Sequence, residues 1–210
     1  MATIVAHHST PKPLALLSIT GIPTFHHPFF NSSTLIPPSP IKEEDIEPFL
    51  IESVAVGSTP PNTFHLNMLL PSGSKNPHFE APAKTRSEQD PNRGMLYDYY
   101  VYENAYVPLV GSVDPGFDWA EDATQSSRLA EWPVTVFIQG DADDDVNIDV
   151  CASVAKRLGT KKGRLFVAEG QGHLFEGTMF LEDETPAMDA VRRAVDDLDQ
   201  AVAEGLKNSA

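Results

Sequence analysis

The sequence predicts an α/β fold built on a small parallel sheet with flanking helices. Three short apolar runs are typical of buried strands: Leu14–Thr20, Val134–Gln139 and Arg164–Ala168. None of them clearly alternates polar with apolar residues, which favours strands covered on both faces, as in a parallel sheet. Helical patterns follow the second and third runs. The order strand, helix, strand, helix predicts a right-handed crossover unit and its successor.

Both predicted helices carry start and stop signals. The first is expected over Ile148–Leu158, where Asn147 caps the start and Gly159 ends the helix. The second is capped by Thr185 and has Pro186 in its first turn. Its apolar residues recur at spacings of three and four and form one stripe: Met188, Val191, Val195, Leu198 and Val202.

Composition excludes some classes of function. The 30 acidic and 15 basic residues give a net charge of -15, which disfavours DNA or RNA as a partner because nucleic-acid binding needs Lys and Arg. The single cysteine, Cys151, rules out an internal disulfide, is expected to be a buried inert thiol, and fits a reducing, cytoplasmic compartment. No apolar run approaches the roughly 18 residues of a membrane span, so none is predicted.

Proline divides the chain of 210 residues into zones, because 14 of its 18 prolines lie between Pro23 and Pro115. We therefore expect residues 1–21 and 132–210 to form the core, with 22–131 as a cap-like or lid-like insertion. The tyrosines of this insertion either form the core of a small subdomain or line an apolar substrate pocket. Five residues around them could share one helix face: Met95, Leu96, Tyr99, Tyr102 and Tyr106.

Two of the predicted strands end in residues that can carry chemistry. The strand at 134–139 runs into G-D-A-D, which ends at Asp143, and the strand at 164–168 runs into E-G-Q-G-H, which ends at His173. Functional groups gather beyond the carboxyl ends of parallel strands, so we expect these two side chains to meet. A carboxylate there would accept the Nδ1 proton of the imidazole and leave Nε2 free to act as a base.

A strand ending in G-D-x-D, paired with a later strand ending in E-G-x-G-H-x-F, resembles the end of α/β-hydrolases, in particular esterases and lipases of the fold-3 type. The resemblance covers Trp132–Glu176 and, less specifically, Lys12–Gly21, which is similar to the sixth strand of that fold. It implies the C-terminal part of a hydrolase sheet, about three parallel strands with flanking helices, plus the cap-like insertion. It also implies Asp143 as the triad acid (with Asp141 as the fallback), His173 as the base, a small-molecule ester as substrate of the full-length family, and no metal or organic cofactor.

The nucleophile of that family is missing from this sequence. Neither the G-x-S-x-G elbow that carries the serine nor an H-G-G segment for the oxyanion hole occurs in the chain. Ser58 and Ser74 follow glycines but lie in the insertion and do not fit the elbow. Met1–His8 is similar to the last turns of the helix that begins at the elbow, so we expect a fragment that is inactive alone.

Two alternatives remain beside the hydrolase fragment. The first is a non-catalytic, hydrolase-like protein that binds a ligand, a partner chain or itself through an exposed sheet edge at Leu14–Thr20. The second is a calcium loop, because four residues alternate like EF-hand ligands: Asp141, Asp143, Asp145 and Asn147. Val146 replaces the glycine that such a loop needs, and Ala152 stands where its glutamate belongs, so no metal site is predicted.

Overall fold

The computed structural model describes residues 2–33, 41–51, 76–77 and 95–209. The chain divides into two compact units, one formed by residues 1–36 and 101–210 and the other by residues 37–100. The second unit lies within the predicted insertion, whereas residues 22–36 and 101–131 belong to the unit that holds the sheet. Ser58 and Ser74 lie outside the described residues.

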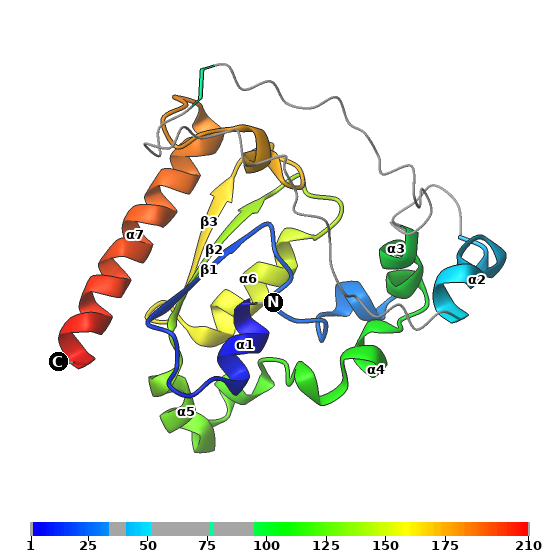
Figure 1. The fold of residues 1–210 in the computed structure, drawn as a ribbon. Helices are drawn as coiled ribbons and strands as arrows, with labels where there is room; N and C mark the ends of the chain where they lie inside the picture. Colours follow the sequence, from blue (N-terminus) through cyan, green and yellow to red (C-terminus); the bar gives the residue numbers. More distant parts are fainter. Residues whose placement is uncertain (1, 34–40, 52–75, 78–94, 210) are drawn as a thin grey trace. The chain divides into compact units, whose positions relative to one another are not determined.

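The sheet consists of three strands, β1 (Ala15–Ile19), β2 (Val134–Gly140) and β3 (Gly163–Ala168), in the order β1-β2-β3 (Figure 1). Both pairings are parallel. Ile138 of β2 lies opposite Ile19 of β1 and Phe166 of β3, so the three strands end at the same edge. The predicted α/β class and its three parallel strands are confirmed.

Helices cover both faces of this sheet (Figure 1). The helix α7 (Pro186–Ser209) packs on one face, and α6 (Ile148–Leu158) with α1 (Ala2–His8) packs on the other. Along β2, Val136 and Ile138 belong to the core on the α7 side, while Phe137 belongs to the core on the α6 side. All three side chains are 0% exposed. Both faces of β2 are therefore apolar, which explains why its sequence does not alternate.

The predicted helix caps are present. Asn147 Oδ1 accepts a hydrogen bond from the backbone N–H of Asp149 at 2.8 Å, and α6 ends at Gly159, whose φ is +71°. Thr185 Oγ1 accepts a hydrogen bond from the N–H of Met188 at 3.3 Å, in the first turn of α7. These bonds pair N–H groups that have no acceptor within the helix, which fixes where each helix begins.

The segment between β1 and β2 contributes an aromatic cluster to the sheet unit. Phe117, Trp119 and Trp132 pack together on the α6 side of the sheet, with ring centroids 5.3–6.0 Å apart. The elements of the sheet unit in this segment are short: α4 (Tyr106–Val110), α5 (Ser126–Glu131), and 3-10 turns at Pro28–Asn31, Gly111–Val113, Asp118–Glu121 and Ala123–Gln125. A further 3-10 turn, Phe175–Thr178, lies between β3 and α7.

The prediction of one helix face from Met95 to Tyr106 is wrong. The helix α3 (Met95–Tyr102) ends before Asn104, whose φ of +55° is incompatible with a continuing helix. Asn104 is held there by Ser33, which donates its N–H to Asn104 Oδ1 at 3.0 Å and accepts from Asn104 Nδ2 at 2.7 Å. The helix α2 (Glu43–Ile51) lies within the second unit. Within the described residues, no helix is both long enough and apolar enough to cross a membrane.

Candidate functional site

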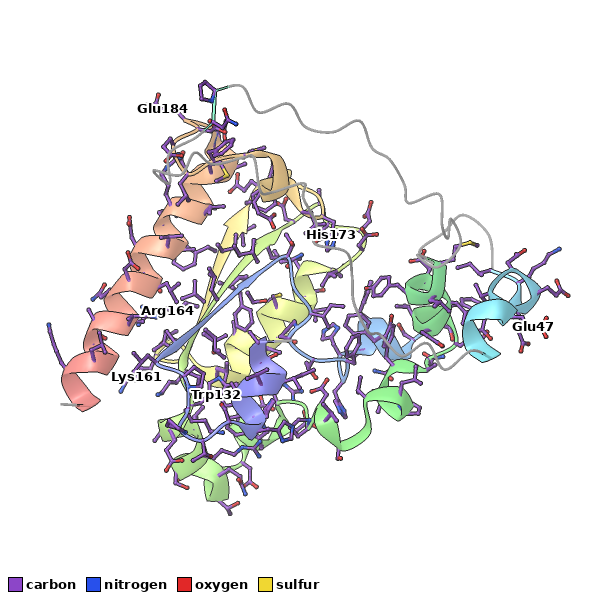
Figure 2. The ribbon with its side chains drawn as sticks, viewed as in Figure 1. Glu47, Trp132, Lys161, Arg164, His173 and Glu184 are labelled. Atoms are coloured by element: carbon purple, nitrogen blue, oxygen red, sulfur yellow. The ribbon has the colours of Figure 1, made fainter. Side chains whose placement is uncertain are left out.

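Asp143 and His173 meet beyond the carboxyl ends of β2 and β3. The imidazole Nδ1 lies 2.9 Å from Asp143 Oδ2. The Asp143 side chain is 0% exposed, whereas 29% of the His173 side chain reaches solvent. Figure 2 shows His173 near the end of the sheet where β2 and β3 terminate. The predicted meeting of these two side chains is confirmed, whereas their catalytic role stays a prediction.

The carboxylate of Asp143 is surrounded by hydrogen-bond donors. Oδ1 accepts the backbone N–H groups of Asp145 at 3.0 Å and Val146 at 2.8 Å. Oδ2 accepts Gln139 Nε2 at 2.6 Å in addition to the bond with His173. A carboxylate offers about four acceptor positions, and four donors occupy them here. The buried charge is therefore fully hydrogen-bonded, which is the condition under which a charged side chain is stable in a protein interior.

This arrangement fixes the tautomer of the imidazole. Asp143 offers only acceptor atoms to His173, so the proton between them sits on Nδ1. A neutral ring then carries a lone pair on Nε2, the atom that a general base uses. Within the part of the chain that the structure describes, Nε2 of His173 has no hydrogen-bond partner. The pair can orient a base and stabilise the imidazolium that forms when the base accepts a proton.

Asp141, the fallback acid, has a different task. Its Oδ1 accepts the N–H of Gly170 at 2.6 Å, which links the end of β2 to the turn after β3. Gly140 lies beside the same turn, because a Cβ on it would stand 2.1 Å from the carbonyl oxygen of Gln171. The close approach of these two loops brings Asp143 to His173, and only glycine permits that approach.

The sequence did not single out three residues that the structure places around the site. Gln139 is 0% exposed, and its Nε2 donates a hydrogen bond to Asp143 Oδ2. Thr20, at the end of β1 with φ of +44°, donates its hydroxyl to Glu176 Oε1 at 3.4 Å. Leu174 follows His173 directly and has φ of +54°. Non-glycine residues in this left-handed region are uncommon and cluster at functional sites. A polar Gln inside an apolar strand was the one available signal.

A cation is the competing interpretation of this cluster. Asp143, Asp145 and His173 each offer a ligand atom, and these atoms lie within 4.8 Å of one another. The hydrogen bonds argue against a resident metal, because all four acceptor positions of Asp143 are occupied by donors and Nδ1 of His173 carries a proton. A metal ligand must present a lone pair. The acceptor positions of Asp143 therefore fit an oriented histidine better than a metal centre, although Nε2 of His173 keeps a lone pair.

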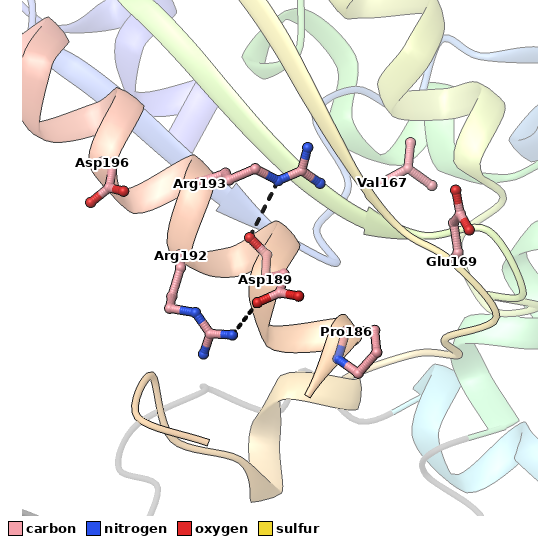
Figure 3. Close-up of a pocket in the computed structure, with 7 residues that line it drawn as sticks. All are labelled: Val167, Glu169, Pro186, Asp189, Arg192, Arg193 and Asp196. Carbon is pink, nitrogen blue, oxygen red and sulfur yellow. Dashed lines mark hydrogen bonds and ion pairs between the residues drawn. The ribbon is translucent and has the colours of Figure 1, made fainter. Parts of the chain in front are cut away.

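Two pockets of the sheet unit lie elsewhere. One, of about 610 Å³, lies between the end of β3 and the first turns of α7. Figure 3 shows Arg192 and Arg193 bonded to Asp189 along its wall. The other, of about 470 Å³, lies where α5 and the turn from α6 to β3 meet and includes Leu129 and Leu158. Neither is lined by Asp143 or His173, so neither defines a substrate for them.

Comparison with known proteins does not place the chain in a family. No protein-family model, no curated protein and no solved structure matches it. The chemistry of the site therefore depends on its own geometry: a buried carboxylate and a histidine that is held by Nδ1, is 29% exposed, and has no partner for Nε2 among the described residues.

Proposed function

We propose that Asp143 and His173 are the acid and base of a site that hydrolyses carboxylic esters, of the kind found in α/β-hydrolases. The observation that carries this proposal is the bond of 2.9 Å from His173 Nδ1 to a carboxylate that is 0% exposed. In such a site His173 Nε2 takes the proton of an attacking hydroxyl and returns it to the leaving group, while Asp143 stabilises the imidazolium. The ester is a small molecule.

The present sequence has no G-x-S-x-G, so we expect no efficient nucleophile within these 210 residues. Removal of a triad serine lowers kcat by about 10⁶ in a well-studied protease. The purified chain should therefore hydrolyse p-nitrophenyl butyrate no faster than its His173→Ala variant. A rate that is well above background and is lost in His173→Ala would show that the chain supplies its own nucleophile.

The decisive experiment reads transcripts in frame upstream of Met1 for G-x-S-x-G and H-G-G. If both are found, the longer protein is expressed and assayed. His173→Ala should lower kcat by about 10⁶ and Asp143→Asn by about 10⁴. The matched variant Asp141→Asn should lower it less than about tenfold, because Asp141 bonds to Gly170 and not to the histidine. A larger loss in Asp141→Asn than in Asp143→Asn would contradict the assignment of the acid.

A second candidate function is self-association through the outer edge of β1. Thr20 donates its N–H to Ile138 of β2 at 2.9 Å. Backbone N–H and C=O groups of successive residues point to opposite sides of a strand. Because those of Thr20 point toward β2, those of Ala15, Leu17 and Ile19 point away from it. Within the described residues no strand pairs with that edge. An unpaired edge is a template for another strand, here the β1 of a second copy in antiparallel orientation.

Light scattering after size exclusion tests this second function. Leu17→Pro removes one outward N–H while leaving the β1–β2 hydrogen bonds in place, and proline is tolerated on edge strands. A concentration-dependent dimer that Leu17→Pro abolishes would support association through β1. A monomer at all concentrations would exclude it. Stop codons in every frame upstream of Met1, together with such a dimer, would favour this function over ester hydrolysis.

A further inference from the structure

The side chain of Gln139 lies behind the Asp143–His173 pair, on the face of β2 that α6 covers. It is 0% exposed, and both its Nε2 and its Oε1 form hydrogen bonds. Nε2 donates one hydrogen to Asp143 Oδ2 at 2.6 Å and the other to the carbonyl oxygen of Val146 at 2.9 Å. Both acceptors belong to the loop 141–147 that joins β2 to α6. One amide thus holds this loop at two points.

The orientation of this amide is defined by its surroundings. Cys151 Sγ, on α6, lies 3.6 Å from Gln139 Oε1 and 3.5 Å from the carbonyl oxygen of Gly21. Burial, with a smaller contribution from Asp143, raises the pKa of the Cys151 thiol to about 12, so the thiol keeps its proton and acts as a donor. A flipped amide would place Oε1 against a carboxylate and a carbonyl oxygen. Only one orientation satisfies every neighbour.

We infer that Gln139 is a positioning residue of this site: it orients the Asp143 carboxylate so that Oδ2 faces His173 and keeps the imidazole in its Nδ1–H tautomer. The catalytic meaning of this inference rests on the proposed function, but the tautomer does not. A continuous path of hydrogen bonds runs from Cys151 through Gln139 and Asp143 to His173. Such buried networks are stabilising only when every member has its partner.

A volume-matched substitution separates positioning from simple packing. Gln139→Met keeps the length of the side chain and removes both N–H donors. Oδ2 of Asp143 then loses its bond of 2.6 Å, and the loop loses its tie at Val146. We expect the carboxylate to rotate, because only His173 and the two backbone N–H groups still hold it. The imidazole is then no longer confined to one tautomer.

The control is Thr135→Val, on the same strand and the same face. Thr135 is also 0% exposed and hydrogen-bonded: its Oγ1 accepts Trp132 Nε1 at 3.1 Å and donates to the carbonyl oxygen of Pro133 at 3.1 Å. The change removes a buried polar group from β2, as Gln139→Met does, but at the opposite end of the strand. It therefore reports general destabilisation without touching the site.

The measurement is ¹⁵N NMR of the full chain with labelled histidine at pH 8, which distinguishes a protonated from an unprotonated ring nitrogen. Wild type and Thr135→Val should show His173 as the Nδ1–H tautomer alone. Gln139→Met should show a mixture in which the Nε2–H form exceeds about a tenth. Unchanged tautomers in Gln139→Met, or an equal change in Thr135→Val, would overturn the inference. If Gln139→Met does not fold, Gln139→Asn, shorter by one methylene, is expected to give the same mixture.

The tautomer is read without any substrate, so its outcome is independent of ester hydrolysis. In a longer form that carries a nucleophile, Gln139→Met should lower kcat by about 10- to 100-fold with little change in KM, because it misplaces a catalytic group and removes no substrate contact. If Gln139→Met shows the mixed tautomers but neither the present chain nor a longer form hydrolyses esters, Gln139 remains a positioning residue. Only the proposed hydrolysis is then refuted.

Discussion

Two histidines of the sheet unit have opposite surroundings. His7, on α1, packs against Trp132, Phe117 and Trp119 with ring centroids 4.6, 5.0 and 6.0 Å away. Its Nδ1 accepts a hydrogen bond from Arg128 at 3.2 Å. His173, beyond the ends of β2 and β3, instead gives its Nδ1 proton to a carboxylate. One ring faces a cation and aromatic rings, and the other faces an anion and solvent.

The comparison shows that burial and the charge of the partner together decide what a histidine ring can do. Burial and then the charge of Arg128 lower the pKa of His7 to about 4, so that ring is neutral near pH 7. Its Nε2 is buried with no hydrogen-bond acceptor among the described residues, and aromatic faces surround it. His7 is therefore a core residue, whereas His173 is bonded through Nδ1 to a carboxylate and has 29% of its side chain exposed.

Gly140→Ala should have the largest effect, because it breaks the loop contact that makes His173 different from His7. The new Cβ would lie 2.1 Å from the carbonyl oxygen and 2.7 Å from the carbonyl carbon of Gln171. Backbone atoms cannot move aside, so the free energy of unfolding should fall by about 3 kcal/mol or more. The bond between Asp143 and His173 should be lost even in molecules that fold. Urea denaturation and the histidine NMR spectrum measure both effects.

The matched change is Gly172→Ala in the adjacent turn. Its Cβ would meet only the carbonyl oxygen of Ala142, at 3.7 Å, which is an ordinary contact. We expect less than about 1 kcal/mol from this change. Equal destabilisation by the two alanines would mean that the close approach at Gly140 is not what holds the loops together.

Much of this site could be predicted because its parts are local. The G-D-A-D and E-G-Q-G-H segments follow apolar runs, and parallel strands end at one edge, so the meeting of Asp143 and His173 follows from the pattern. The role of Gln139 could not be predicted, because its partners lie on the loop and on α6 and depend on how the helix packs. The aromatic cluster around His7 joins α1 to residues more than 100 positions away, a relation that no local pattern contains.

His7 should give the chain a specific acid sensitivity. Its pKa is about 4 in the folded protein and 6.5 as the ordinary value, so between these values the unfolded chain binds more protons. Its neutral ring therefore stabilises the fold fully above about pH 6.5, and this stabilisation is lost as the pH falls toward 4. The shift would correspond to about 3 kcal/mol for a fully buried ring, and we expect about 1–2 kcal/mol after screening of the partly exposed ring.

Urea denaturation at a series of pH values between 7 and 4 measures how the free energy of unfolding falls with pH. His7→Phe should remove the contribution of His7 to this pH dependence, because phenylalanine fits the aromatic cluster and does not titrate. His8→Gln, one residue further along α1, should keep it, because His7 is still present. If His7→Phe retained the pH dependence of the wild type, acid sensitivity in this range would have to come from other groups.

Arg128→Gln should have the smallest effect and tests the cause of the low pKa directly. Arg128 bonds to His7 and lies over the Trp119 ring, 4.1 Å from its centroid. Burial is the larger cause of the lowered pKa and the arginine charge the second, so removal of the charge should raise the pKa of His7 from about 4 without restoring 6.5. The lost cation–π contact should cost about 0.5–1 kcal/mol. An NMR titration of the His7 ring measures this change in pKa. The control is Arg157→Gln, which removes an arginine paired with Asp118. A return to 6.5 in Arg128→Gln would mean that charge and not burial separates His7 from His173.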